Sequence, residues 1–230
     1  MYILSNLKEL PSELGNVHTL ELLGLSKIKQ LPALVLASSS PYRRQLLSQL
    51  GLAFKVHHPD IDESTIPGET ARELVSRLAT EKALAISADA QGGLIIGSDQ
   101  VAVQGDKIEG KPRDRQDAIR QLSEASGREI TLQTGLALLN STSGRVQVDV
   151  IPYKVRFRKL TLPQIEAYLD VEVPFGCCGS LRADGLGIAL LESLTGDDPS
   201  ALIGLPLIRL VEMLESEGVR VIPEPDSIKA

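Results

Sequence analysis

The chain has 230 residues, of which 43% are hydrophobic and 23% charged, and this fits one large α/β domain with or without an appendage. The net charge of −6 excludes a surface that attracts nucleic acid polymers or acidic membranes as a whole, so a polyanionic ligand needs a locally basic cleft. No apolar run reaches the length of a membrane-spanning helix, and the N-terminus lacks the order of a secretory signal, which predicts a cytoplasmic protein.

The first 32 residues differ from the rest of the chain. Their leucines are spaced as in a single leucine-rich repeat, but one repeat cannot bury its own apolar face without neighbours. We therefore predict an N-terminal extension of unknown role at residues 1–32 and a main domain at residues 33–230.

From Ala33 onward, short apolar runs alternate with helical patterns. Strands are expected at Ala33–Ala37, Ala53–His57 and Leu94–Gly97, and helices at Pro41–Leu50 and Thr70–Ala88. A further helix runs from its cap, Asp114, to Ser126, with Asp117 placed as in a capping box. Two β-rich stretches, Glu129–Asn140 and Arg145–Arg158, flank the hairpin turn Ser141–Gly144, and the patterns of Pro163–Asp170 and Leu205–Ser216 are helical. Strands that alternate with helices, together with a long hairpin, predict an α/β fold with a mixed sheet and helices on both sides.

The first candidate site is Ser38–Arg44, where a buried strand turns into a helix. Ser40 suits the N-cap and Pro41 the first helical position, and the free N–H groups at such a helix end bind anions. Arg43 and Arg44 stand in this first turn although the helix dipole disfavours cations there, and Arg43 shares a helical face with leucines. An anionic ligand explains both features, and a solvated basic turn is the alternative.

Charged residues at other places fit the same cleft. Lys82 falls in the apolar stripe of its expected helix, so it either snorkels past the core or reaches a polar cleft. Asp99 follows the apolar run Leu94–Gly97 and is expected at the carboxyl end of that strand, where α/β sheets collect ligand sites. Asp60–Glu63 adds three carboxylates after another strand, which either cap a loop or bind a hard cation such as Mg²⁺.

Two further patterns are set aside. Gly105–Lys111 begins like a phosphate-binding loop, but Pro112 replaces the hydroxyl residue that binds the metal, so Lys111 can reach a phosphate only from an ordinary turn. The adjacent Cys177 and Cys178 are interpreted as reduced, small buried residues and not as catalytic thiols.

The chain resembles the Maf-type nucleotide pyrophosphatases at six ordered motifs: Ser38–Arg44, Asp60–Glu63, Glu81-Lys82, Gly97–Asp99, Gly110-Lys111-Pro112 and Gly204-Leu205-Pro206. The similarity runs from about Leu34 to Leu214, so residues 33–230 are interpreted as a Maf-like nucleotide pyrophosphatase domain. The resemblance implies an elongated mixed α/β structure with a deep cleft between two lobes. It also implies hydrolysis of a nucleoside triphosphate between its alpha and beta phosphates, which gives a monophosphate and pyrophosphate.

Roles follow by position within the resemblance. It implies that Asp99 is catalytic and accepts the proton of the attacking water. The residues implied to hold the triphosphate are Ser38, Arg43, Arg44, Lys82 and Lys111. Glu63 and Asp99 are implied to bind a divalent metal cofactor, Mg²⁺ or Mn²⁺.

Three further positions concern the choice of base. Gly97-Ser98-Asp99-Gln100 resembles the branch of the family that acts on 7-methyl-GTP, and the residues tied to base choice map to Tyr42, Gln100 and Asp184. That branch usually has Trp at the first position and Glu at the third, whereas here Tyr42 keeps an aromatic face and Asp184 a carboxylate. Guanine methylated at N7 carries a positive charge and needs both groups. The expected function is therefore removal of a modified nucleotide, 7-methyl-GTP.

Three alternatives stay open. The chain could be a nucleotide-binding regulator of cell division with little turnover, or a dTTP/UTP pyrophosphatase. A protein-interaction module is a third reading, which rests on the leucine-rich extension alone. The expected partner is a small-molecule nucleotide, with no nucleic acid polymer and no membrane, and a homodimer is left open.

Overall fold

The structure is a computed structural model that describes residues 32–222. The strands are β1 (Leu34–Ala37), β2 (Phe54–His57), β3 (Leu94–Gln104), β4 (Lys107–Glu109), β5 (Glu129–Asn140), β6 (Val146–Phe157) and β7 (Leu191–Thr195). The α-helices are α2 (Pro41–Ser48), α3 (Ala71–Ala85), α4 (Arg115–Ala125), α5 (Leu162–Glu172), α6 (Pro199–Ile203) and α7 (Leu207–Ser216). Two short 3₁₀ helices are η2 (Cys178–Ser180) and η3 (Leu186–Leu190). The predicted extension, apart from Pro32, lies outside the described residues and stays a prediction.

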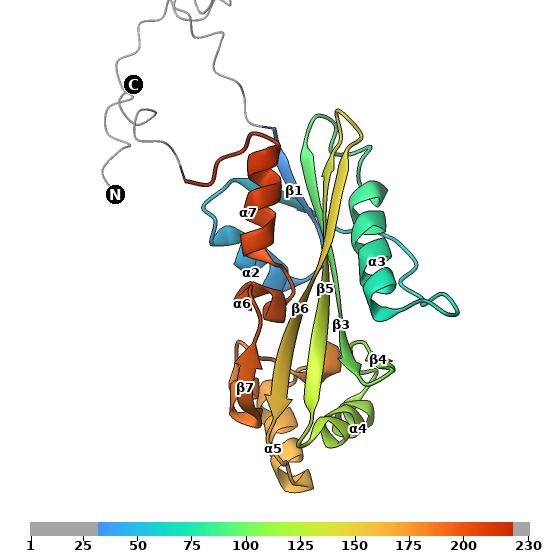
Figure 1. Cartoon of the computed structure of the whole chain (residues 1–230), viewed down its shortest axis with the longest axis vertical. Coiled ribbons are helices and arrows are strands. Elements are labelled where there is room, and N and C mark those ends of the chain that lie inside the picture. The colour runs from blue at the N-terminus through green and yellow to red at the C-terminus, as the bar shows by residue number, and fades with distance from the viewer. Residues whose placement is uncertain (1–31, 223–230) are drawn as a thin grey trace, which may run out of the picture. The chain divides into compact units, whose positions relative to one another are not determined.

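The described strands form one mixed sheet in the order β2-β1-β3-β5-β6-β7, with β4 paired to β3. β1 runs parallel to both of its neighbours, and the other pairs are antiparallel. α3 packs on one face of the sheet, whereas α2 and α7 lie on the other (Figure 1). The predicted α/β class with a mixed sheet and helices on both sides is therefore confirmed. A deep cleft between two lobes stays a prediction.

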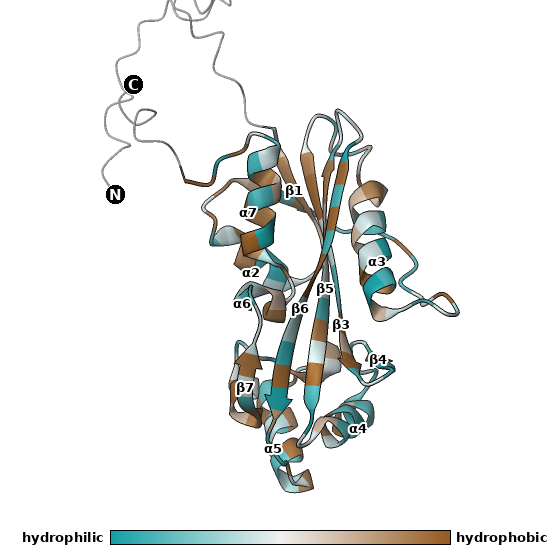
Figure 2. Cartoon of the chain, viewed as in Figure 1, coloured by the Kyte–Doolittle hydropathy of each residue, from teal (hydrophilic) through white to brown (hydrophobic). Residues whose placement is uncertain are grey.

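The two kinds of pairing are visible in the hydropathy of the strands. β1 is buried at every position and is brown in Figure 2, as expected for a parallel strand covered on both faces. β6 alternates instead, with Val155 and Phe157 buried and Lys154 and Arg156 exposed. Among the residues that the structure describes, no helix is long and apolar enough to cross a bilayer.

The hydrophobic core is divided along the long strands. One cluster joins β1, β3 and β5 to α2 and α7, and it includes Ile96 of β3. A second cluster joins β5 and β6 to α4 and α5, and it includes Ala102 of β3. The polar segment Ser98-Asp99-Gln100 therefore lies between the two clusters on β3.

The prediction that β3 ends at Gly97 is wrong. Its pairing with β5 extends from Leu94 to Val103, and the strand continues to Gln104. Asp99 therefore lies within a strand and not at the carboxyl end of its own strand.

The predicted capping box of α4 is also wrong, although the cap residue itself is correct. Asp114 caps the helix by accepting the N–H of Asp117 at 2.8 Å. The carboxylate of Asp117 accepts the N–H of Arg113 at 3.1 Å, one residue before the cap, so it does not return to Asp114.

Two glycines let α3 approach the sheet closely. A Cβ atom on Gly97 would lie 2.0 Å from the carbonyl oxygen of Ala79, and one on Gly135 would lie 2.1 Å from that of Val75. Both distances are far inside van der Waals contact, so no larger residue fits without moving the helix. Gly135 is also the register partner of Asp99 on the neighbouring strand. The glycines therefore set the height of α3 above the sheet at the point where Asp99 lies.

Candidate active site

Three segments meet at the carboxyl ends of the parallel strands. Ser38 follows β1, Asp60–Glu63 follows β2, and Asp99 lies two residues beyond Gly97, the last residue of β3 that pairs with β1. Asp99 is thus level with the end of β1, where open α/β sheets gather their ligand sites, even though its own strand continues.

Lys82 is the centre of a charge cluster that it forms with one buried carboxylate, Asp99, and one exposed carboxylate, Glu63. Lys82 is only 4% exposed, and Asp99 is 7% exposed. The Nζ atom of Lys82 donates to Asp99 Oδ1 at 2.6 Å and lies 2.8 Å from Glu63 Oε1. Of the two interpretations of Lys82, the structure supports the polar cleft, because its amine ends on carboxylates and not in solvent.

The carboxylates after β2 have different environments. Burial raises the pKa of Glu63, but the hydrogen bond from Lys82 and nearby cations outweigh it, so the pKa lies below its usual range. Asp62 accepts the N–H of Ser64 at 2.9 Å, and its hydrogen bonds to Ser64 lower its pKa. Of the carboxylates in Asp60–Glu63, Glu63 alone lines either of the two cavities described below.

Arg43 is oriented by its helix and by the loop after α6. Ser40 caps α2 by accepting the N–H of Arg43 at 3.4 Å, and Pro41 begins the helix, as predicted. The Nε atom of Arg43 donates to the carbonyl oxygen of Gly204 at 2.8 Å, and Ser98 Oγ donates to the same oxygen at 2.9 Å. This oxygen therefore ties the first turn of α2 to β3.

Ser38 and Arg44 are placed differently from Arg43. Ser38 is buried, and its Oγ accepts the N–H of Ser40 at 3.1 Å, so it shapes the turn before α2. Arg44 is exposed, and neither residue lines the two cavities. A direct contact with the triphosphate stays a prediction for both.

A cavity of 270 Å³ lies over the Lys82 cluster. Its charged lining residues are Arg43, Glu63, Lys82, Asp99 and Lys111. Three cations face two carboxylates, and this excess of positive charge suits a polyphosphate. The structure thus brings the other residues predicted to hold the phosphates and the metal to one place.

A second cavity, of 40 Å³, adjoins the first. The two share Arg43, Gln100, Lys111 and Cys178. Tyr42 and Asp184 also line the second cavity, so the residues predicted to choose the base lie together with Gln100. Burial, above all, raises the pKa of Tyr42, which keeps its hydroxyl protonated.

Gln100 is held by the protein. Its Nε2 atom donates to Thr134 Oγ1 at 2.9 Å and to the carbonyl oxygen of Ala201 at 2.7 Å. These bonds occupy both amide N–H donors, so a base can contact Gln100 only through the Oε1 acceptor.

Sequence reasoning missed two charged residues beside the base positions. Arg182 Cζ lies 5.5 Å from the centre of the Tyr42 ring, and Arg182 Nη1 donates to Glu172 Oε1 at 2.5 Å. Arg182 Nε also lies 3.5 Å from Asp184 Oδ1. No periodic pattern in the glycine-rich region 176–187 indicates either contact.

The two cysteines lie at the site without the chemistry of a catalytic thiol. Cys178 Sγ donates to the carbonyl oxygen of Gln100 at 2.8 Å, and burial raises its pKa to about 12. Burial also raises the pKa of Cys177, and both thiols are free. Protonated thiols are poor nucleophiles, which supports the prediction that neither cysteine is catalytic, but both are half-buried and not buried as predicted.

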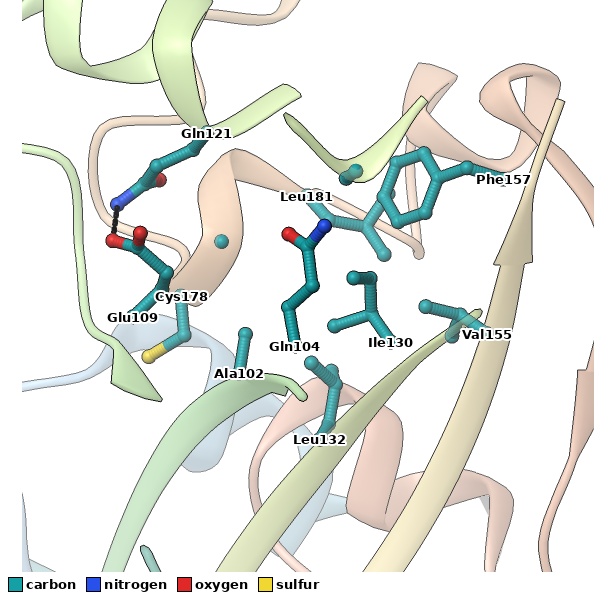
Figure 3. A pocket seen from close by; sticks show the side chains of 12 residues that line it. Ala102, Gln104, Glu109, Gln121, Ile130, Leu132, Val155, Phe157, Cys178 and Leu181 are labelled. Atoms are coloured by element: carbon teal, nitrogen blue, oxygen red, sulfur yellow. Dashed lines mark hydrogen bonds between the residues drawn. The ribbon is translucent and has the colours of Figure 1, made fainter. Parts of the chain in front are cut away.

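Beyond Cys178 lies a third cavity, of only 20 Å³ (Figure 3). Ile130 and Phe157 are among the apolar side chains that line it, and at its edge Gln121 Nε2 donates to Glu109 Oε2 at 3.2 Å. This volume holds no ligand larger than a water molecule, so we assign it to core packing.

Glu63 and Asp99 fit a divalent metal that arrives with a nucleotide. An oxygen of each lies within 2.8 Å of the same Lys82 Nζ, which keeps the two carboxylates together. In residues 32–222 no group of three or more His, Cys, Asp or Glu side chains could hold a metal ion. Mg²⁺ commonly uses one or two carboxylates together with substrate phosphates, and this donor set meets that requirement.

Comparison with known proteins covers nearly all of the described residues. The family described as Maf-like protein matches residues 33–217. The chain is 55% identical over 191 residues to the 7-methyl-GTP pyrophosphatase of Pseudomonas syringae pv. tomato. The match spans 83% of this chain and 100% of that relative. The protein of the same name in Alcanivorax borkumensis is 55% identical over 192 residues, which are 84% of this chain and 98% of that relative. The one in Pseudomonas fluorescens is 56% identical over 186 residues, which are 81% of this chain and 97% of that relative. The chain therefore belongs to the Maf-like protein family.

Proposed function

We propose that this chain hydrolyses a nucleoside triphosphate between its alpha and beta phosphates, prefers 7-methyl-GTP, and releases 7-methyl-GMP and pyrophosphate. One observation carries the proposal: a cationic cavity with two carboxylates adjoins a second cavity lined by an aromatic ring and a carboxylate, and both share Arg43 and Lys111. A phosphate chain needs the first set of groups, and a cationic base needs the second. The similarity to 7-methyl-GTP pyrophosphatases supports the same substrate.

The phosphate end is assigned to the larger cavity. Arg43, Lys82 and Lys111 bind the triphosphate oxygens, with Arg43 oriented by its hydrogen bond to Gly204. Asp99 accepts a proton from the water that attacks the alpha phosphorus. The bond from that phosphorus to the bridging oxygen breaks, pyrophosphate leaves, and the cations stabilise its negative charge.

Glu63 and Asp99 are the residues that would hold a divalent metal, Mg²⁺ or Mn²⁺. When bound, such a metal offsets phosphate charge and polarises phosphoryl oxygens. Lys82 holds both carboxylates in position for this, at 2.8 Å from Glu63 and 2.6 Å from Asp99.

The base end is assigned to the smaller cavity. Methylation at N7 gives guanine a delocalised positive charge, which favours an aromatic face and a carboxylate in the base plane. Tyr42 and Asp184 supply these groups, and Gln100 Oε1 accepts from the base edge. Because dTTP and UTP carry no charge on the base, they gain less from the same groups.

The setting of the reaction follows from its substrate. The enzyme acts in the cytoplasm on a free nucleotide and removes a modified one from the pool. A homodimer is not needed by this mechanism and stays open. A regulator of cell division needs the cationic cavity but not a proton acceptor at Asp99, and the assay below separates the two.

Purified protein incubated with 7-methyl-GTP and Mg²⁺ is expected to release one pyrophosphate per 7-methyl-GMP, measured by chromatography and a pyrophosphate-coupled assay. The kcat/KM for 7-methyl-GTP is expected to exceed the values for GTP, dTTP and UTP. Orthophosphate and a diphosphate as primary products would exclude cleavage at the alpha phosphorus. A higher kcat/KM for dTTP or UTP would exclude the base assignment, and binding without turnover would favour the regulator.

A further inference from the structure

The base end of the site is closed in this structure. The cavity lined by Tyr42, Gln100 and Asp184 has 40 Å³, against 270 Å³ for the phosphate end. A water molecule's share of liquid volume is roughly 30 Å³, and ligand pockets have roughly 300 to 1,000 Å³. A purine base therefore needs a side chain to move before it can enter.

Arg182 occupies the place where the base is proposed to bind. Its guanidinium carbon lies 5.5 Å from the centre of the Tyr42 ring, and its Nε lies 3.5 Å from Asp184 Oδ1. A planar, delocalised cation near an aromatic face and a carboxylate matches the requirements of 7-methylguanine. Arg182 thus uses the two groups that the base would need.

The contacts of Arg182 differ in quality. Its Nε–H is buried and has no hydrogen-bond partner among the described residues, although Asp184 is near. Its Nη1, in contrast, donates at 2.5 Å to Glu172, whose side chain is only 9% exposed. A buried N–H without an acceptor is unfavourable, so when the side chain leaves Tyr42 and Asp184 the relief of this penalty partly offsets the loss of the cation–π contact and the ion pair. It keeps its best bond if Glu172 serves as the pivot.

We infer that Arg182 is a gate on the base end of the site, which closes over Tyr42 and Asp184 in the free protein and swings away on Glu172 when a base binds. The inference rests on the proposed function, because that function assigns the base to this cavity. A closed state lowers the apparent affinity by the fraction of molecules that are open, and this factor applies to every base. Arg182 therefore weakens binding without choosing between bases, whereas Asp184 chooses.

Arg182→Met tests the gate, because methionine keeps an unbranched chain and removes the guanidinium. The probes are 7-methyl-GMP and GMP, the products of the proposed reaction, and their dissociation constants are measured by calorimetry. Both constants are expected to fall by about 3- to 30-fold, the range for a partly exposed cation–π contact and ion pair together. A constant that stays the same or rises for either nucleotide would overturn the gate, since Arg182 would then be neutral or contact the bound base.

Three further variants make the result interpretable. Arg115→Met is the control: Arg115 lies on α4, and its Nη2 is 2.7 Å from Asp170 on α5. This variant should leave both dissociation constants unchanged. Arg182→Lys keeps the charge beside Glu172 but loses the planar stack, so both dissociation constants should fall, as in Arg182→Met. This variant decides the question if Arg182→Met does not fold. Asp184→Asn should weaken the binding of 7-methyl-GMP more than that of GMP, because the neutral amide cannot form an ion pair with the charged base.

The binding measurement also separates the gate from the proposed function. Product binding requires no turnover, so a protein that releases no pyrophosphate would refute the hydrolase and still report on Arg182. A protein that turns over 7-methyl-GTP but shows no change in Arg182→Met would retain the hydrolase and lose the gate.

Discussion

Lys82 carries a full positive charge on the otherwise apolar face of α3. Burial of an ammonium group is unfavourable unless charged partners replace the lost water. Asp99 and Glu63 supply those partners at 2.6 and 2.8 Å. A buried ion pair stabilises a fold poorly, because apolar side chains of similar volume do as well or better. We therefore attribute the cluster to function and not to stability.

Replacement of Asp99 by asparagine keeps the shape of the side chain and removes its charge. If Asp99 accepts the proton of the attacking water, Asp99→Asn lowers kcat for 7-methyl-GTP by about two to four orders of magnitude. Lys82 retains Glu63 as a charged partner, so the variant is expected to fold. Pyrophosphate release gives kcat, and circular dichroism during heating reports the fold.

Asp62→Asn is the matched control for this substitution. Asp62 is an exposed carboxylate of the neighbouring loop that accepts the N–H of Ser64 and lines neither cavity. Its kcat is expected to equal that of the wild type. A folded Asp99→Asn protein with near-normal kcat would remove Asp99 from the mechanism.

The residues of the site could be predicted to different degrees. Arg43 and Lys82 both conflict with local rules. Arg43 puts a positive charge in the first turn of a helix, and Lys82 puts one on the apolar face of a helix. Such conflicts are visible in a sequence and mark functional sites. Arg182 and Glu172 conflict with no local rule, and only the path of the chain brings Arg182 to Tyr42. Contacts of that kind cannot be found from pattern and spacing.

At the scale of elements, α3 is close to the sheet because Gly97 and Gly135 carry no side chain. In Gly135→Ala the new Cβ would lie 2.1 Å from the carbonyl oxygen of Val75, so helix and strand must separate. Overpacking of this kind costs about 1–3 kcal/mol of the free energy of unfolding. The displaced helix moves Lys82 away from Asp99, so kcat/KM is expected to fall by more than the loss of folded protein explains. Urea denaturation and steady-state kinetics measure the two effects.

Gly144→Ala separates a general loss of stability from movement of α3. Gly144 lies in the turn between β5 and β6 with a left-handed φ of 73° and open space around it. Alanine there costs about 1–2 kcal/mol through backbone strain and leaves the spacing of α3 unchanged. The two variants are expected to lose similar stability, but only Gly135→Ala to lose activity. Equal kcat/KM in both would show that the height of α3 does not control the site.

Local patterns identified the longer elements. β5, β6, α2 and α3 were expected within a few residues of their observed bounds, because the hydrophobic period and the cap residues are local. β3 was expected too short, since Ser98-Asp99-Gln100 is polar and typical of a loop, and only its pairing with β5 makes it a strand. β4, β7 and α6 were not predicted, because elements of three to five residues depend on their neighbours.

At the scale of the whole molecule, the relatives indicate which part of the chain the enzyme needs. The Pseudomonas syringae protein is matched over 100% of its length by 83% of this chain, so it has no counterpart to the remainder. The family match begins at residue 33, and β1 begins at Leu34 between β2 and β3. Every candidate site residue follows β1 in the chain.

We therefore expect a chain that lacks residues 1–32 to keep the kcat/KM of the full chain for 7-methyl-GTP and to bind 7-methyl-GMP equally well. Removal of residues 1–37 is the matched comparison, because it also takes away β1, which pairs with β2 on one side and β3 on the other. That longer deletion breaks the centre of the parallel part of the sheet and is expected to unfold the protein, as circular dichroism would show. If the shorter deletion instead folded and lost activity, the extension would have to contribute to the site. If it kept full activity, any protein interaction of the extension would be separate from the chemistry.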